Sequence, residues 1–147
     1  MKHLIAALLT VSVIQGYAAM SDLEAIGLIE SGGNDRKIGS AGEVSRYQIL
    51  PKVWQSYTRS RDFRNAWVAR EIARRHLGIL SQSFRAQAGR PAAAFDLYVM
   101  WNAGLGYYRR AGFRPANVHS TIRERAQRFV NLKQLNTPAS AGRLASN

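Results

Sequence analysis

Apolar residues recur at helical spacing along most of the chain, and no segment alternates between apolar and polar residues for more than a few positions. This pattern predicts a mainly α-helical fold. One exception is the stretch SAGEVSRYQI at 40–49, where Gly42 favours the turn of a short β-hairpin. The expected helices cover residues 22–31, 51–58, 62–79 with a break at Gly78, 81–88, 91–103 and 120–134.

The first of these helices is the best defined, because both of its ends carry a local signal. Ser21 with Glu24 three positions later is the pattern of a capping box, in which each side chain satisfies a backbone N–H at the helix start. Gly32 and Gly33 follow the last apolar turn, and glycine readily takes the left-handed conformation that ends many helices. We therefore expect this helix to cover residues 22–31.

A carboxylate occupies the inward face of this helix. Leu23, Ile26 and Glu30 follow i, i+3, i+7 spacing, so Glu30 lies on the same stripe as two apolar residues. An apolar environment and the negative end of a helix both disfavour the charged form of a carboxylate. A carboxyl group that carries a proton near neutral pH is what general acid catalysis requires. Glu30 is therefore the first candidate catalytic residue, and the alternative is a helix-end glutamate that pairs with one of the many arginines.

The 147-residue chain divides into three predicted parts. Residues 1–18 combine one lysine, an apolar run and small residues, which is typical of a secretory signal peptide. The apolar run at 4–14 is shorter than the roughly 20 residues that a membrane-spanning helix needs, so a retained membrane anchor is the less favoured alternative. Residues 19–135 are expected to form one domain and residues 136–147 a flexible tail, in a protein that is periplasmic or secreted.

The chain is strongly basic, with a formal net charge of +12 that comes from 17 arginines and 4 lysines against 9 acidic residues. Such a charge predicts an anionic partner, which can be nucleic acid, acidic lipid or the carboxylates of a cell wall. Export argues against nucleic acid. The chain has no cysteine, and His76 and His119 are the only histidines after the leader, so no disulfide, metal or other cofactor is expected.

Four short motifs in a fixed order carry a family resemblance. They are ESGGN at 30–34, GEVSRYQI at 42–49, MWNAGLG at 100–106 and RAQRFVNL at 125–132. Each motif alone is weak, but together and in this order they resemble the soluble lytic transglycosylases and goose-type lysozymes. The resemblance implies a monomeric, lysozyme-like helical domain with a groove that binds the glycan strands of peptidoglycan.

By this resemblance, Glu30 is the single catalytic acid. It would protonate the glycosidic oxygen between N-acetylmuramic acid and N-acetylglucosamine while an oxocarbenium-like state develops on the sugar. In a lytic transglycosylase, the 6-hydroxyl of the muramic acid then attacks, and the same glutamate takes its proton. The product has a 1,6-anhydro end, and no second carboxylate is required. Ser31 can orient Glu30 or the substrate, or only close the helix.

The same motifs supply the expected substrate-binding residues. Gln48 can pin its loop or contact an N-acetyl group, and Asn102 can bind sugar or cap a helix. Trp101 offers a flat face to a pyranose ring or is a buried core residue, whereas Trp54 and Trp67 are expected in the core. The full set is Ser31, Tyr47, Gln48, Trp101, Asn102, Tyr107, Tyr108 and Arg125, with Tyr107 and Tyr108 expected on a loop at the groove.

The chain departs from the family pattern at three positions. Glu43 adds a carboxylate to the loop expected opposite Glu30, and is the second candidate catalytic residue. If the two carboxylates lie about 6.5–9.5 Å apart, Glu43 can activate a water as general base, and the enzyme is an inverting lysozyme. Alternatively, Glu43 pairs with Arg46 or another arginine. Ser45 replaces a glycine whose backbone angle serine adopts less readily, and Arg125 replaces a tyrosine and can grip a substrate carboxylate.

Two other classes of protein stay open at this stage. A non-catalytic wall-binding module would keep the groove and the charge, although it would not need to keep Glu30 and Ser31. A secreted basic protein that binds nucleic acid or acidic surfaces would explain the charge without explaining the order of the motifs.

Overall fold

The computed structural model describes residues 20–135, which are mainly α-helical, as the sequence predicts. The predicted signal peptide at 1–18 and the predicted tail at 136–147 lie outside the described residues. The elements are α1 (Asp22–Ser31), α2 (Pro51–Gln55), α3 (Ala66–Ala88), α4 (Ala94–Ala103), α5 (Leu105–Arg110), the 3-10 helix η1 (Pro115–Asn117) and α6 (Ser120–Leu135).

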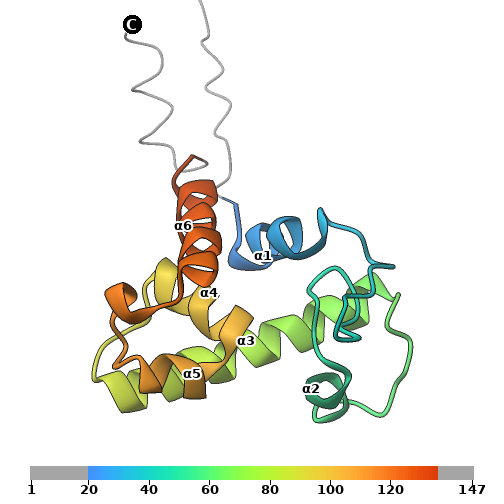
Figure 1. Ribbon diagram of the computed structural model, residues 1–147. Coiled ribbons are helices and arrows are strands. Elements are labelled where there is room, and N and C mark those ends of the chain that lie inside the picture. The colour runs from blue at the N-terminus through green and yellow to red at the C-terminus, as the bar shows by residue number, and fades with distance from the viewer. Residues whose placement is uncertain (1–19, 136–147) are drawn as a thin grey trace, which may run out of the picture.

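The long helix α3 organises the rest of the chain (Figure 1). Helices α1 and α2 and the loop between them lie along its N-terminal half, and α4, α5 and α6 lie over its C-terminal half. Helix α4 packs against α6, α5 and α3, and α1 packs against α6 and α3. No helix within residues 20–135 is long and apolar enough to span a membrane.

Helix α1 has the predicted bounds, because its capping box forms as expected. The Ser21 hydroxyl accepts a hydrogen bond from Glu24 N at 3.3 Å, and Ser21 N donates to the Glu24 carboxylate at 2.8 Å. The helix ends at Gly32, whose φ of +67° is the left-handed conformation that glycine adopts without steric cost. Leu23 and Ile26 are buried, which confirms the inward face that also carries Glu30.

Helix α3 corrects a prediction, because it runs unbroken through Gly78 where the sequence suggested an end. Asn65 caps the start of the helix, and its side-chain oxygen accepts from Trp67 N and Val68 N at 3.1 Å each. A glycine inside a helix costs only about 1 kcal/mol relative to alanine. The buried face of α3 outweighs that cost, so the two helices predicted at 62–79 and 81–88 are one.

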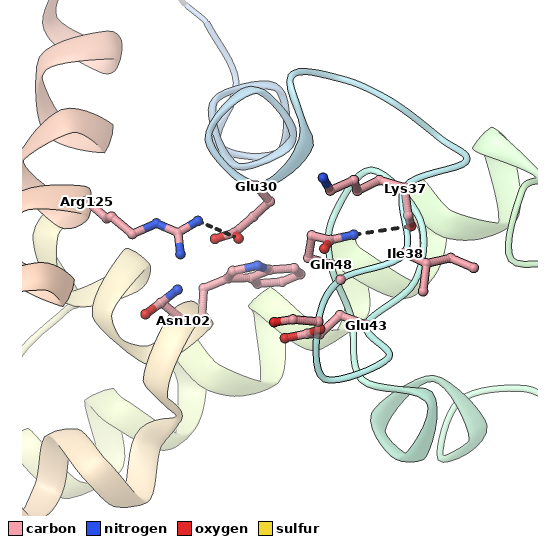
Figure 2. Close-up of a pocket in the computed structure, with 10 residues that line it drawn as sticks. Glu30, Lys37, Ile38, Glu43, Gln48, Asn102 and Arg125 are labelled. Atoms are coloured by element: carbon pink, nitrogen blue, oxygen red, sulfur yellow. Dashed lines mark hydrogen bonds and ion pairs between the residues drawn. The ribbon is translucent and has the colours of Figure 1, made fainter.

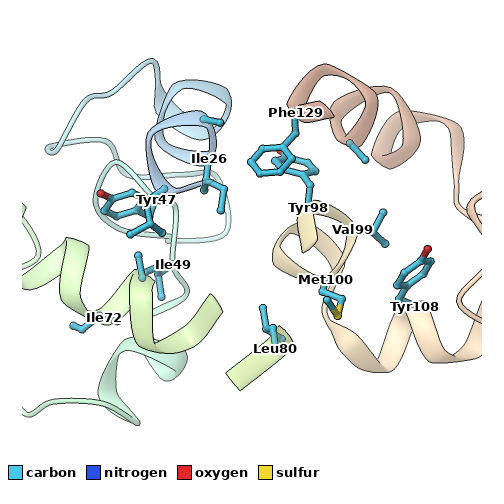
Figure 3. Packing of buried hydrophobic residues seen from close by; sticks show 14 of the residues in the cluster. Ile26, Tyr47, Ile49, Ile72, Leu80, Tyr98, Val99, Met100, Tyr108 and Phe129 are labelled. Atoms are coloured by element: carbon cyan, nitrogen blue, oxygen red, sulfur yellow. The ribbon is translucent and has the colours of Figure 1, made fainter. Parts of the chain in front are cut away.

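The core is built from side chains of every long helix, which converge between α1, α3, α4 and α6 (Figure 3). Tyr98 from α4 stacks at a tilt on Phe129 from α6, with ring centroids 5.5 Å apart. Burying a large apolar side chain contributes roughly 1.5–3 kcal/mol. The largest fully buried side chains are Trp54, Tyr98, Tyr108, Phe84, Phe129, Ile26, Met100 and Val99.

The loop between α1 and α2 replaces the predicted hairpin with isolated antiparallel bridges, which join Val44 to Ile38 and to Ile49. Gly42 makes the turn as predicted, with a φ of +81°. Ser45 has a φ of +65°, the strained angle anticipated for this position, and its side chain is buried. The Ser45 hydroxyl accepts from Tyr47 N at 3.3 Å, which helps to hold the loop in this conformation.

The segment after α4 also differs from the prediction. Gly104 has φ +85° and ψ 153°, a conformation essentially restricted to glycine, and it turns the chain between two helices. The following residues form α5 and not the expected loop, so Tyr108 points into the core. Of the two tryptophans expected in the core, Trp54 is fully buried, but Trp67, in the first turn of α3, is 75% exposed, so the prediction for Trp67 is wrong.

Candidate active site

A cleft of about 390 Å³ lies where the two halves of the molecule meet (Figure 2). Helix α1 contributes Glu30, and the loop after it forms the facing wall. Helix α4 contributes Trp101 and Asn102, and α6 contributes Arg125. The lining is mostly polar, and its residues are Glu30, Lys37, Ile38, Gly39, Ser40, Glu43, Gln48, Trp101, Asn102 and Arg125.

Glu30 is held by two side chains that are distant in sequence. Its side chain is only 7% exposed. The Tyr98 hydroxyl donates to Oε1 at 2.6 Å, and Arg125 Nη2 donates to Oε2 at 2.9 Å. The surroundings of Glu30 are therefore a hydroxyl and a cation, not the apolar environment expected from the sequence. The ion pair with Arg125 that was considered as the alternative role of Glu30 is thus present, and both partners donate to the carboxylate at the cleft.

Tyr98 is a functional candidate that the sequence reasoning missed. Burial, followed by the negative charge of Glu30, raises the pKa of Tyr98 far above its ordinary value, so the hydroxyl keeps its proton and acts as a donor. Helical spacing is the sequence signal that could have identified Tyr98. It precedes Trp101 and Asn102 by three and four positions, so the three residues lie on the same side of α4.

Glu43 faces the cleft from the loop, and its Oε2 accepts from Ala41 N at 3.0 Å. Arg46, its suggested partner, instead pairs with Asp35 through two hydrogen bonds of 2.6 and 2.5 Å, which lower the pKa of Asp35. Within residues 20–135, Glu43 forms no ion pair at all. The ion-pair interpretation of Glu43 is therefore wrong for this part of the chain.

Gly39 is a second residue that the sequence reasoning missed. A Cβ atom at this position would lie 2.2 Å from Glu43 Oε2 and 2.6 Å from Gln48 Oε1. Real Cβ atoms do not approach oxygen so closely, so both side chains reach the cleft only because Gly39 leaves room for them.

Gln48 pins its loop with one end of its amide. Nε2 donates to Ser45 O at 2.9 Å and to Lys37 O at 3.3 Å, while Oε1 lies over Gly39. The structural role considered for Gln48 is thus present, and the carbonyl end lines the cleft. Contact between this carbonyl and a ligand stays a prediction.

Trp101 and Asn102 end α4 at the cleft. Trp101 Nε1 donates to Tyr47 O at 3.3 Å, and the Trp101 and His76 rings pack in a T-shaped arrangement with centroids 5.5 Å apart. Burial lowers the pKa of His76, so this ring is neutral near pH 7. The Asn102 side chain makes no hydrogen bond to any residue in the described part of the chain, and its amide lines the cleft.

Four predicted substrate-binding residues do not line the cleft. Tyr47 and Tyr108 are buried in the core, and a core side chain cannot contact a bound glycan. The Tyr107 hydroxyl accepts from His119 N at 2.9 Å, away from the cleft lining. The Ser31 hydroxyl donates to Arg46 O at 2.8 Å and accepts from Asn34 N, so Ser31 ties the loop to α1 and does not contact Glu30.

The charges of the cleft alternate in sign. Lys37 and Arg125 lie on opposite sides of Glu30 (Figure 2), and Glu43 faces them from the loop. Residues 20–135 contain no group of three His, Cys, Asp or Glu side chains that could hold a metal ion. No protein-family model, curated protein or solved structure matches this chain.

Proposed function

We propose that this protein cleaves the β-1,4 bond between N-acetylmuramic acid and N-acetylglucosamine in peptidoglycan, with Glu30 as general acid and base. The observation that carries the proposal is the placement of Glu30, a nearly buried carboxylate whose two partners fix it at a polar cleft. We further propose that the fold is lysozyme-like and that the protein is exported to the periplasm or the medium, where it meets peptidoglycan.

The residues opposite Glu30 suit an amino sugar. The Asn102 amide, which has no hydrogen-bond partner within residues 20–135, can donate to and accept from an N-acetyl group. The carbonyl of Gln48 can accept from a sugar hydroxyl or amide. Trp101 also lines this cleft and supplies an aromatic side chain. A net charge of +12 favours binding to a polymer that carries carboxylates.

The proposed reaction needs one carboxyl group in two protonation states. Glu30 gives its proton to the glycosidic oxygen, and the bond from that oxygen to the muramic acid breaks as positive charge develops on the ring. The 6-hydroxyl of the same muramic acid attacks this carbon and returns a proton to Glu30. The products are a free 4-hydroxyl on N-acetylglucosamine and a 1,6-anhydro muramic end, with no net consumption of water.

A second candidate function is inverting hydrolysis. It is favoured by Glu43, a carboxylate without an ion-pair partner in the described residues that lines the same cleft as Glu30. In this reaction, Glu43 takes a proton from a water that attacks the muramic carbon, and the products are one water heavier.

Mass spectrometry of the products separates these functions. Purified residues 19–147 would be incubated with intact peptidoglycan, and we expect muropeptides that end in 1,6-anhydro muramic acid. The variant Glu43→Gln should then keep its activity. Reducing muramic ends, together with loss of activity in Glu43→Gln, would support the hydrolase. Binding without any product would overturn the enzyme proposal in favour of a wall-binding module.

A further inference from the structure

The two partners of Glu30 differ in their freedom to move. Tyr98 is fully buried on α4, so its hydroxyl is fixed against Oε1. The Arg125 side chain is 37% exposed and lines the cleft from α6, so its guanidinium can turn toward a ligand. One oxygen of Glu30 is thus permanently occupied by a donor, and the other is occupied by a group that can leave.

This arrangement determines where a proton can sit on Glu30. A proton on Oε1 would leave the Tyr98 hydroxyl without its acceptor in a buried site, which carries a free-energy cost. At Oε2, Arg125 Nη2 donates from 2.9 Å away, and the positive charge of the guanidinium opposes the addition of a proton to the same oxygen. Oε2 is therefore the oxygen that becomes open to a proton when the Arg125 guanidinium moves away.

We propose that a carboxylate of the bound glycan takes Arg125 away from Glu30, and that Glu30 then takes up one proton on Oε2. This inference rests on the proposed function, and it assigns Arg125 the role of a specificity-determining residue. The charges balance, since the carboxylate of the ligand replaces that of Glu30 beside Arg125 and solvent supplies the proton. The acid that cleaves the bond forms only when a carboxylate-bearing sugar is in place.

The other charged groups of the cleft are compatible with this exchange. Lys37 and Glu43 face Glu30 from the loop, and Tyr98 faces it from α4. Lys37 makes no side-chain ion pair within residues 20–135, so it offers a second cation to an anionic ligand. Glu43 is the alternative proton acceptor in the cleft, and it can be removed separately. A neutral glycan such as chitin has no carboxylate to bind Arg125, so the ion pair between Glu30 and Arg125 would stay intact.

Titration calorimetry with a ligand that cannot be cleaved tests the exchange. The probe is N-acetylmuramyl dipeptide, which has a free carboxylate on its peptide but no glycosidic bond, and N-acetylglucosamine is its neutral counterpart. Measurements near neutral pH in two buffers of different ionisation enthalpy give the number of protons taken up on binding. For the wild-type protein we expect uptake approaching one proton with the muramyl ligand and none with the neutral sugar.

Variants identify the residue that takes up the proton and the residue that binds the carboxylate of the ligand. Glu30→Gln should bind the muramyl ligand without proton uptake, whereas Glu43→Gln should keep the uptake. Arg125→Gln should lose the uptake and bind the muramyl ligand about tenfold more weakly, because a charge-assisted contact is lost. The matched control is Arg128→Gln, which removes an exposed arginine of α6 outside the cleft and should behave as wild type.

Three results would overturn the exchange. These are binding of the muramyl ligand by the wild-type protein without proton uptake, equal uptake with the neutral sugar, and no binding of the muramyl ligand at all. Cleavage of peptidoglycan is measured separately on the same preparation. Cleavage without ligand-linked proton uptake would reject the exchange and leave the proposed function intact.

Discussion

Two buried carboxylates in this protein share the same kinds of partner but differ in what surrounds them. Asp96 accepts from both terminal nitrogens of Arg90 at 2.6 and 3.0 Å, from the Tyr108 hydroxyl at 2.6 Å and from Ala93 N at 2.8 Å. Glu30 also has one tyrosine and one arginine, but only two hydrogen bonds, and it lines the cleft.

The difference separates the structural role of Asp96 from the proposed catalytic role of Glu30. Burial alone would raise the pKa of Asp96, but the hydrogen bonds from Arg90, Tyr108 and Ala93 N outweigh burial and hold this pKa below its ordinary value. Asp96 is thus a permanent charge that fixes the start of α4 and the position of α5. Glu30 has acceptor capacity left over, and that capacity faces the place where a substrate would bind.

The largest expected effect on stability comes from breaking the Asp96 cluster. Asp96→Asn leaves Arg90 and Tyr108 without their charged acceptor, and we expect a loss of about 3 kcal/mol in the free energy of unfolding. Urea denaturation measures this loss. The turnover of the protein that remains folded should not change, since Asp96 lies outside the cleft. A loss below about 1 kcal/mol would mean that Asp96 lacks the structural role that distinguishes it from Glu30.

The pH dependence of stability sharpens the same contrast. Because the pKa of folded Asp96 is lowered from 3.8, its contribution to stability is fully present above that value and is lost as the pH falls through the folded pKa. The wild-type protein should therefore lose stability on acidification below about pH 4 more steeply than Asp96→Asn. Parallel acid denaturation curves for the two proteins would contradict this prediction.

The two tyrosines form a matched pair for the next largest effect. Tyr98→Phe and Tyr108→Phe each remove one hydrogen bond to a buried carboxylate, which is worth about 1.5–3 kcal/mol. We expect similar losses of stability in thermal or urea denaturation. Only Tyr98→Phe should also lower turnover, by about tenfold, because only Tyr98 orients Glu30. Equal turnover in both variants would mean that Tyr98 has no role beyond packing.

Two glycines give the smallest effect, and the sign of the effect differs between them. Gly39→Ala places a methyl group against Glu43 and Gln48, and we expect a loss of about 1 kcal/mol together with reduced turnover. Gly78→Ala meets no atom within 4 Å on the exposed side of α3 and should stabilise the protein by about 0.5–1 kcal/mol. Thermal denaturation of both variants checks the two signs, and stabilisation by Gly39→Ala would show that the loop tolerates a side chain.

Features that depend on neighbouring residues could be predicted from the sequence. The capping box of α1 spans three positions, and the glycine that ends the helix directly follows it. The inward orientation of Glu30 follows from its spacing to Leu23 and Ile26. The mainly α-helical fold and most helix positions were predictable because they also follow from residues close together in the sequence.

Features that depend on distant residues were not predictable in this way. Tyr98 reaches Glu30 across 68 positions and Arg125 across 95, and no local pattern indicates either contact. The burial of Tyr108 depends on the restart of a helix after Gly104 and on its hydrogen bond to Asp96. The polar surroundings of Glu30, which the sequence suggested would be apolar, are a consequence of this tertiary packing.

The most direct test of the central claim is the rate at which wild-type and Glu30→Gln proteins release muropeptides from purified peptidoglycan. The account predicts that Glu30→Gln loses about 10³-fold or more of the rate, while it stays folded and still binds peptidoglycan. Circular dichroism and a pull-down with insoluble peptidoglycan would establish folding and binding in the same preparation. An unchanged rate in Glu30→Gln would contradict the account, because the carboxyl group at the cleft would then have no part in breaking the bond.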